Sequence, residues 1–476
     1  MQNPSNSKIQ EQIDEVFSAQ KIQALKMRNS TSLLRIALLK KLLDWIKLNQ
    51  EDIRRAVHAD FKKPYPEINI SEIYAVNSEI NHAIKHLEGW MKPKKVPTPM
   101  TMLGAKSHIQ FEPKGTTLII APWNYPFNLA IGPLVSALAA GCTAIIKPSE
   151  MTPHSSALVR RLVVETFDKS LVAVFEGEKE VSQMLLSKPF DHIFFTGSPA
   201  VGKIIMKAAA ENLSSVTLEL GGKSPTIIDK KADLKDAAEK VIYAKFLNCG
   251  QTCIAPDYVL VHESVKEYFL GLLKEQIGKM YDPKKKGIEH SKDYARLVNA
   301  KHLKKIKNLL SDAEMKGAVL YSGGDNGPEE YFEPTIITDL KEDMDIMQEE
   351  IFGPILPVLG FSDLEEAITY INLKPKPLAL YLFTTDKDAQ KRVLKETSSG
   401  SAVINDCALH FLQNELPFGG VNSSGIGKAH GYHGFLAFSN EKSVMKQRIG
   451  KTLTKPLHPP YGIMGRKIID GLLKWF

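Results

Sequence analysis

The stretch Asn248-Cys-Gly-Gln-Thr-Cys-Ile-Ala-Pro-Asp-Tyr258 places Cys253 in a short polar loop directly after an apolar, helical run over 241–247. A thiol in such a loop can be partly exposed, and a nearby helix end can lower its pKa until the thiolate serves as a nucleophile. Cys249 competes for that role, although the apolar run before it favours a supporting position. An isolated cysteine is more often an inert core residue, so the assignment depends on what other segments supply.

Two distant segments carry side chains that suit a thiol nucleophile. In Ala121-Pro-Trp-Asn-Tyr-Pro126, the Asn124 amide follows a β-rich run and can donate to a developing oxyanion, an effect worth roughly 3 kcal/mol. In Leu218-Glu-Leu-Gly-Gly-Lys223, Glu219 ends an apolar run beside bare backbone, where a carboxylate can have a raised pKa and act as a general base. The alternatives are an Asn124 that bonds its own turn and a Glu219 that is a buried structural acid.

Further residues suit a dinucleotide. In Gly197-Ser-Pro-Ala-Val-Gly202, glycines lie between a predicted strand and a predicted helix, where backbone amides can approach a pyrophosphate. Lys147 and Glu150 can address ribose hydroxyls, while Glu350 can hold a second ribose and Phe352 can flank a flat ring. Each segment alone is equally consistent with an ordinary turn, because none contains the G-x-G-x-x-G fingerprint. The thirteen histidines show no Cys/His or H-E-x-x-H spacing, so we expect no metal site.

The order of elements predicts an α/β fold. Apolar repeats from Leu34 to Ile46 predict an N-terminal helix that Ser32 caps. Strands are predicted at 116–121, 143–147, 191–196 and 216–220, alternating with helices at 127–140, 155–167 and 201–210. A second α/β unit has a helix at 303–310 and strands at 318–322, 335–338 and 355–361. Strands alternating with helices indicate mostly parallel sheets, in which ligands bind beyond the carboxyl ends of the strands.

The bulk composition indicates a soluble globular protein of two or three domains. The chain has 476 residues, 43% hydrophobic and 24% charged, and a formal net charge of +7. That charge is small for this length, and the scattered lysines lack interleaved aromatic residues, which argues against nucleic-acid binding. Four cysteines, no signal-peptide core and no run near the ~18 apolar residues of a spanning helix predict a cytoplasmic protein.

The last residues predict an amphipathic helix. Apolar and basic side chains alternate over 461–476, so one face can lie on a membrane surface or cover an apolar substrate entrance. The alternative is a tail that docks on its own or a partner subunit. The apolar members are Ile463, Met464, Ile468, Ile469, Leu472, Leu473, Trp475 and Phe476, and the basic ones are Arg466, Lys467 and Lys474.

Taken together and in this order, the motifs resemble the aldehyde dehydrogenase superfamily from about residue 20 to residue 445. The cysteine loop followed by Ala-Pro-Asp-Tyr is similar to the class 3 branch, which includes fatty and aromatic aldehyde dehydrogenases. So are Leu416-Pro-Phe-Gly-Gly420 and the late Pro459-Pro-Tyr461. Asn422 and Ser423 depart from the pattern, because Gly-Asn is expected after the Phe-Gly-Gly turn.

The resemblance implies a role for each motif. Cys253 corresponds to the nucleophile, Asn124 to the oxyanion amide and Glu219 to the base. The implied cofactor residues, for NAD or NADP, are Trp123, Lys147, Glu150, Gly197, Ser198, Gly202, Glu350 and Phe352. The expected fold has a Rossmann-type cofactor domain at 1–218 and a catalytic domain at 219–403. An oligomerisation extension near 85–110 and at 404–450 makes a homodimer, and the tail occupies 451–476.

The implied activity is oxidation of aldehydes to carboxylic acids through a cysteine thiohemiacetal and thioester, with medium-chain, long-chain or aromatic substrates. A coenzyme A-acylating enzyme is the alternative, although such enzymes usually lack a base at the Glu219 position. A non-enzymatic basic binding protein is the remote alternative, because it depends on net charge alone. Glu150 favours NAD, since a carboxylate repels the 2′-phosphate of NADP.

Overall fold

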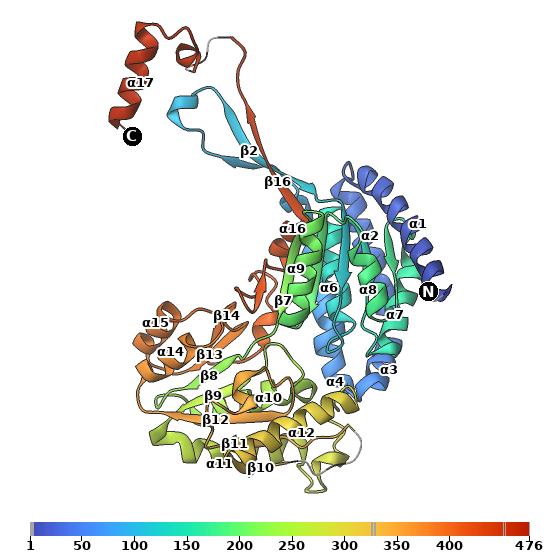
Figure 1. The fold of residues 1–476 in the computed structure, drawn as a ribbon, viewed down its shortest axis with the longest axis vertical. Helices are drawn as coiled ribbons and strands as arrows, with labels where there is room; N and C mark the ends of the chain where they lie inside the picture. The colour runs from blue at the N-terminus through green and yellow to red at the C-terminus, as the bar shows by residue number, and fades with distance from the viewer. Residues whose placement is uncertain (1–3, 325–326, 328–329, 451, 453, 476) are drawn as a thin grey trace.

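Two sheets with their covering helices form the body of the molecule, and a third, smaller sheet projects from it. The computed structural model describes residues 4–324, 327, 330–450, 452 and 454–475. In Figure 1 the six-stranded sheet lies in the upper body and the seven-stranded sheet in the lower body. The α/β fold with mostly parallel sheets is therefore confirmed.

Residues 4–90 are largely helical, as the apolar repeats predict, whereas the rest of the first hundred residues includes the strand β1 (Lys94–Val96). The long helices are α1 (Pro4–Met27), α2 (Ser32–Leu48), α3 (Gln50–Phe61) and α5 (Ala75–Trp90), and α4 (Tyr65–Ile68) and the π-helix η1 (Asn69–Tyr74) lie between the last two. The predicted cap of α2 is wrong by one residue. Thr31, in extended backbone, accepts a hydrogen bond from the Leu34 amide, whereas Ser32 is the first helical residue.

The six-stranded sheet has the strand order β15-β7-β6-β3-β4-β5. Its parallel strands are β3 (Thr116–Ile120), β4 (Thr143–Lys147), β5 (Val172–Val174), β6 (His192–Gly197) and β7 (Ser215–Leu220), and only β15 (Gly425–Ile426) is antiparallel. The connecting helices are α6 (Asn128–Ala140), α7 (Pro153–Thr166), α8 (Lys179–Leu186) and α9 (Pro199–Glu211). Successive side chains of β3 alternate between two cores: Ile119 faces the layer of α2, α5 and α6, and Leu118 and Ile120 face that of α1, α8 and α9.

The seven-stranded sheet has the order β10-β11-β12-β9-β8-β13-β14, in which only β10 is antiparallel. The strands are β8 (Pro225–Ile228), β9 (Tyr258–His262), β10 (Val319–Ser322), β11 (Thr335–Thr338), β12 (Ile355–Phe361), β13 (Ala379–Phe383) and β14 (Ser401–Ile404). The covering helices are α10 (Leu234–Phe246), α11 (Lys266–Tyr281), α12 (Ala300–Met315), α13 (Asp345–Gln348), α14 (Leu364–Asn372) and α15 (Lys387–Glu396). Only residues 221–224 separate β7 from β8, so the carboxyl end of one sheet leads directly into the other.

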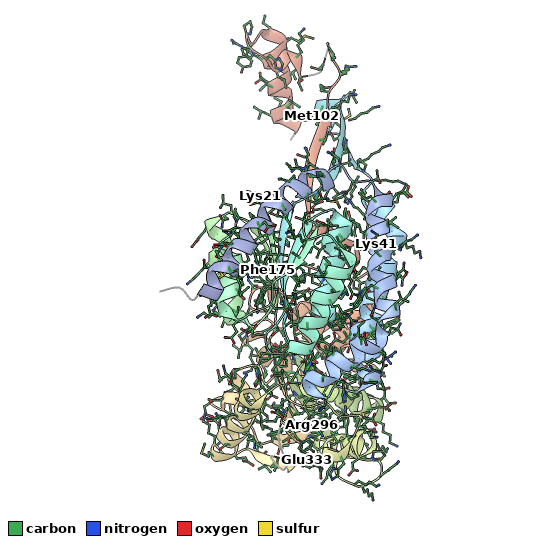
Figure 2. The ribbon with its side chains drawn as sticks, turned by 90° about the vertical axis from the view of Figure 1, so that its right-hand side faces the viewer. Lys21, Lys41, Met102, Phe175, Arg296 and Glu333 are labelled. Atoms are coloured by element: carbon green, nitrogen blue, oxygen red, sulfur yellow. The ribbon has the colours of Figure 1, made fainter. Side chains whose placement is uncertain are left out.

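The chain returns to the upper body before it leaves in the extension. After η6 (Leu409–Leu412), β15 pairs with β7, and α16 (Gly431–Ala437) packs against α5 and α6. Strand β16 (Ser439–Lys446) then joins β1 (Lys94–Val96) and β2 (Lys106–Pro113) in an antiparallel sheet. Figures 1 and 2 agree that this sheet projects from the body, with Met102 near its outer end.

The tail forms the helix α17 (Ile463–Trp475), which packs against η7 (Lys455–Leu457). Figure 1 places it beyond the extension, away from both large sheets. Ile463, Met464 and Leu473 are each more than 70% exposed, and Phe476 lies outside the described residues. None of the helices in the described ranges has the length and apolar character needed to cross a bilayer.

Candidate active site

The cysteine loop begins where α10 ends, with three consecutive residues in the left-handed region. Their φ angles are 54° at Asn248, 56° at Cys249 and 74° at Gly250. A Cβ at Gly250 would lie 2.3 Å from the Gly353 carbonyl oxygen, so only glycine fits there. This backbone course reverses the chain and turns Cys253 toward the gap between the two large sheets.

Hydrogen bonds from buried amides hold the loop in place. Gln251 donates from Nε2 to the carbonyls of Asn248 (2.9 Å) and Arg296 (3.0 Å), and its Oε1 accepts from the Val298 amide (3.0 Å). The Gln251 carbonyl accepts from Nδ2 of Asn124 (3.0 Å) and of Asn248 (3.1 Å). The Asn124 side chain is therefore hydrogen-bonded to the backbone of the residue two positions before Cys253. Asn124 itself does not line the cavity beside Cys253.

The two cysteines of the loop differ in their surroundings. Cys253 is partly exposed and lines a cavity, whereas Cys249 is fully buried in the core of the lower body. The Cys249 thiol donates to the hydroxyl of Tyr294 (3.4 Å), and burial raises its pKa to about 12. Only Cys253 can therefore meet a substrate in this arrangement.

The expectation that a helix end lowers the pKa of Cys253 is wrong. Burial, followed by the carboxylates of Glu350 and Glu219, raises this pKa, while the backbone amides of Cys253 and Ile254 oppose the shift. The loop follows the carboxyl end of α10, and the partial negative charge of that end does not stabilise a thiolate. The thiol accordingly needs a neighbouring base to take its proton.

Glu219 lies on β7, next to the edge strand β15 of the six-stranded sheet, and lines the same cavity as Cys253. It is 5% exposed, and burial raises its pKa to about 8, against the opposing effects of Lys428 and Thr196. Its Oε1 is buried without a hydrogen-bond partner among the described residues. A carboxyl group in this state can exchange a proton near neutral pH.

Behind Asn124 lies a buried ion pair that the sequence motifs did not indicate. Lys63 Nζ donates to Glu72 Oε1 (2.8 Å) and to the Asn124 carbonyl (3.1 Å), and the second Glu72 oxygen accepts from the Asn128 amide (2.8 Å). The ammonium also lies 3.9 Å from the centre of the Tyr125 ring. Neither side chain belongs to a recognisable motif, so only their contacts reveal that they support the 124–128 segment.

The predicted nicotinamide-side residues lie next to one another. Phe352, in left-handed backbone (φ 50°), packs edge-on against Trp123 with ring centres 5.3 Å apart. Burial and the charge of Asp257 raise the pKa of Glu350 to about 8. A Cβ at Gly221 would lie 2.0 Å from Glu350 Oε2, so the missing side chain makes room for the carboxyl group.

The predicted adenosine-side residues lie at the carboxyl ends of β4 and β6. Lys147 is 3% exposed and its Nζ lies 2.5 Å from Glu150 Oε2. Ser198 caps α9 by accepting from the Val201 amide (3.4 Å). Gly202 has a packing role, since a Cβ there would lie 2.8 Å from a methyl group of Leu220.

Of the predicted site residues, Cys253 and Glu219 line one apolar cavity, whereas Asn124 and the predicted cofactor residues do not. Cys253 and Glu219 lie in its wall, which is otherwise dominated by aliphatic and aromatic side chains. Of the residues that line it, the large apolar ones are Ile70, Tyr125, Leu129, Leu220, Tyr243, Leu247, Ile254, Leu378, Leu409, Phe411, Leu412 and Phe418. Such a wall favours an apolar ligand with one polar reacting group.

A thiol and a carboxyl group of raised pKa in the wall of one apolar cavity suit covalent chemistry on a carbonyl compound. The model of the aldehyde dehydrogenase family matches residues 5–444. The chain belongs to this family. The protein is therefore an oxidoreductase that oxidises aldehydes, and the reading as a non-enzymatic basic binding protein is wrong.

Similar aldehyde dehydrogenases come from several organisms. The 4,4'-diaponeurosporen-aldehyde dehydrogenase of Staphylococcus aureus is 47% identical over 89% of this chain and 91% of that protein. Aldehyde dehydrogenase family 3 member A2 of Pongo abelii is 40% identical over 90% of this chain and 86% of its own length, which confirms the predicted class 3 resemblance.

Solved structures agree with the fold. A substrate-bound Staphylococcus aureus AldH superposes with a TM-score of 0.91 at 44% identity, over 97% of this chain and 99% of that chain. A betaine aldehyde dehydrogenase from the same species, in complex with NAD+, has a TM-score of 0.84 at 28% identity, over 94% of this chain and 89% of that one.

Proposed function

We propose that this aldehyde dehydrogenase uses Cys253 as nucleophile, Glu219 as base and the Asn124 amide with the Cys253 backbone N–H as oxyanion donors. The proposal is supported chiefly by Cys253 and Glu219 sharing one apolar cavity. Asn124 Nδ2 carries two hydrogens, and the bond to Gln251 uses one of them. The other is the donor that we assign to the oxyanion.

The residues at the carboxyl edge of the upper sheet fit a nicotinamide dinucleotide. Lys147 and Glu150 offer an ammonium and a carboxylate for ribose hydroxyls, Gly197 and Ser198 lie at the N-terminus of α9 for a pyrophosphate, and Glu350 offers a second carboxyl group. Trp123 and Phe352 form an aromatic wall beside them, and Gly202 brings α9 close to β7. When bound, NAD(P) accepts the two electrons that the aldehyde gives up.

Each step assigns a proton or a bond to a named atom. Glu219 takes the Cys253 proton, and the sulfur forms a bond to the carbonyl carbon while the oxyanion is held by the two donors. Loss of the carbonyl hydrogen with its electron pair to the cofactor leaves a thioester on Cys253. Glu219 releases the thiol proton to solvent and then takes a proton from water, whose oxygen attacks the acyl carbon. The carbon–sulfur bond breaks, the carboxylic acid leaves, and the Cys253 thiolate regains a proton from Glu219. The sum is aldehyde, water and NAD+ giving acid, NADH and a proton.

The two cysteines of the loop provide the test. Cys253→Ala is expected to abolish aldehyde-dependent NADH formation, whereas Cys249→Ala, beside it in the loop but outside the cavity, keeps measurable turnover. Circular dichroism confirms that both variants fold. Turnover retained by Cys253→Ala would refute the assignment.

The cofactor and the acyl acceptor are tested separately. We propose NAD as the preferred cofactor, because Glu150 repels a 2′-phosphate, and rates with NAD and NADP measure the preference. The coenzyme A-acylating alternative predicts acyl-CoA when coenzyme A is supplied. Free acid as sole product, with Glu219 beside the thiol, supports hydrolysis.

The cavity wall supports medium-chain, long-chain or aromatic aldehydes as substrates. Each buried CH2 contributes about 0.8 kcal/mol, so kcat/KM is expected to rise about fourfold per carbon until the cavity is filled. A kcat/KM that is independent of chain length would contradict this substrate class.

We also propose that the enzyme is a cytoplasmic homodimer whose tail touches a membrane. Its domains are proposed to comprise residues 1–218, 219–403, 404–450 and 451–476. The antiparallel sheet of β1, β2 and β16 projects from the body and offers an oligomerisation surface, and all four cysteines are free. The exposed apolar residues of α17 support the membrane contact. Light scattering measures the oligomer, and flotation with vesicles compares the full chain with a form that ends at residue 450.

A further inference from the structure

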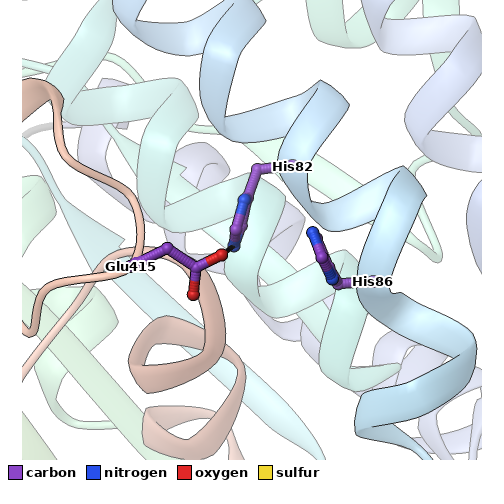
Figure 3. Close-up of side chains that lie close together, drawn as sticks. All are labelled: His82, His86 and Glu415. Atoms are coloured by element: carbon purple, nitrogen blue, oxygen red, sulfur yellow. Dashed lines mark ion pairs between the residues drawn. The ribbon is translucent and has the colours of Figure 1, made fainter.

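Two histidines of α5 and one glutamate of a neighbouring loop form a cluster outside the proposed catalytic machinery. His82 and His86 are one helical turn apart, and Glu415 reaches them from the loop after η6. One ligand atom from each residue can be chosen so that all three lie within 4.8 Å of one another. Figure 3 shows the Glu415 carboxylate and the His82 ring facing each other, with His86 further along the helix.

The His82 side chain is prepared for a ligand. Its Nε2 is buried and has no hydrogen-bond partner among the described residues, and the nearest Glu415 oxygen is 3.8 Å away, beyond hydrogen-bonding distance. An imidazole nitrogen that has no other partner is a good ligand for a transition metal.

We propose that His82, His86 and Glu415 bind a zinc-like divalent transition-metal ion, with water as the fourth ligand. Zinc accepts imidazole nitrogen and carboxylate oxygen at about 2.0–2.2 Å, which places neighbouring ligand atoms roughly 3.3–3.6 Å apart in a tetrahedron. The His82–Glu415 separation of 3.8 Å is close to that value. The Glu415 side chain is 68% exposed, so its rotation can bring the carboxylate oxygen from 3.8 Å to this distance from His82 Nε2.

Such an ion would join α5 to a loop that forms part of the cavity wall. Phe411 and Leu412 of η6 and Phe418 of the loop after it line the cavity. One hydrogen bond already connects α5 to this loop, because Asn414 Nδ2 donates to Ser78 Oγ (2.9 Å). The ion adds a second, reversible connection, which restricts the loop without touching Cys253.

Zinc binding to the full chain tests the site. Cys253→Ser serves as the background, so that the exposed thiol is not a ligand. A competition titration with a chromogenic chelator is expected to give one zinc ion per chain, and His86→Gln or Glu415→Gln is expected to raise Kd at least tenfold. His290→Gln is the matched control, because His290 also lies near a glutamate, Glu289 (3.7 Å), on the surface. Unchanged affinity in both ligand variants would overturn the proposal.

Hydrogen exchange tests the connection to the cavity wall and does not depend on catalysis. Zinc is expected to slow amide exchange over 409–418 in the Cys253→Ser protein, and to have no such effect in Glu415→Gln. His82→Gln can unfold locally because its side chain is largely buried, so His86→Gln and Glu415→Gln carry the test. Bound zinc with unchanged exchange over 409–418 would overturn the role in restricting the loop.

Discussion

Lys63 Nζ lies 2.8 Å from Glu72 Oε1, and both side chains are fully buried. This pair holds the carbonyl of Asn124 and the amide of Asn128, so it supports both ends of the segment that supplies the proposed oxyanion donor. Burial lowers the pKa of Lys63, and the charge of Glu72 opposes this shift. The pair does not line the cavity itself, but it contacts Tyr125 and Asn128, which do, and it positions Asn124.

Glu72→Gln is expected to destabilise the protein by about 3–5 kcal/mol, because it leaves a buried ammonium without a counter-charge. Urea unfolding followed by fluorescence measures the change. Glu275→Gln is the control, since it breaks an exposed ion pair with Lys279 on α11 that contributes little to stability. Similar midpoints for the two variants would contradict the role of the buried pair.

Glu219→Gln is expected to slow both steps in which Glu219 takes a proton, the activation of Cys253 and the release of the acid. NADH should form more slowly in the first turnover as well as in the steady state, where turnover should fall roughly 10²–10⁴-fold. In the wild type, acid release needs the carboxylate, so its rate should rise with pH and level off above about pH 8. Stopped-flow absorbance measures both phases, and a wild-type steady-state rate in the variant argues against Glu219 as base.

The same residue has a predicted effect on stability. Folded Glu219 keeps its proton up to about pH 8, whereas an ordinary glutamate loses it near 4.5, so the folded state binds more protons in that window. Its contribution to the free energy of unfolding therefore falls as pH rises from about 4.5 to 8. Denaturant unfolding at pH 5 and pH 8 should show a larger loss for the wild type than for Glu219→Gln; equal losses would exclude the effect.

Gly221→Ala is expected to weaken cofactor binding. Its Cβ would lie 2.0 Å from the Glu350 carboxylate, which must move away from the place where we propose that it holds a ribose. The KM for NAD should rise about tenfold or more, an energy of at least about 1.4 kcal/mol. Gly271→Ala on α11 is the control, because nothing lies within 4 Å of its added methyl group. Equal KM values in these two variants would mean that Glu350 does not contact NAD.

Phe411→Ala is expected to reduce activity with long-chain aldehydes selectively. The ring lines the cavity and packs on Phe418 at 5.1 Å and His430 at 4.6 Å between centres. Loss of its apolar surface should lower kcat/KM about tenfold for a ten-carbon aldehyde, at about 1.5 kcal/mol, and leave acetaldehyde nearly unchanged. Leu213→Ala, 93% exposed, is the control. An equal fall for both substrates would place Phe411 outside the substrate path.

Local sequence patterns predicted most of the elements. The strands predicted at 143–147, 335–338 and 355–361 have these bounds in the structure, because fully buried parallel strands are short apolar runs between turns. The cap at Ser32 was misplaced because Thr31 and Ser32 have equivalent hydroxyls, and only the backbone angle at Thr31 distinguishes them. The predicted general acid–base role of Glu219 and nucleophilic role of Cys253 remain predictions that these experiments test.

The sequence by itself determined the α/β architecture, the family and the candidate thiol, amide and acid, since these follow from local periodicity and from motifs of a few residues. Only the tertiary structure decided how those groups are surrounded. The Lys63–Glu72 pair, the space that Gly221 leaves for Glu350 and the approach of Glu415 to His82 join segments that are distant in the chain or depend on packing. The tertiary structure also decided the proton affinity of the thiol. Burial and neighbouring charge raise the pKa of Cys253, and the residues beside it in the chain do not reveal either effect.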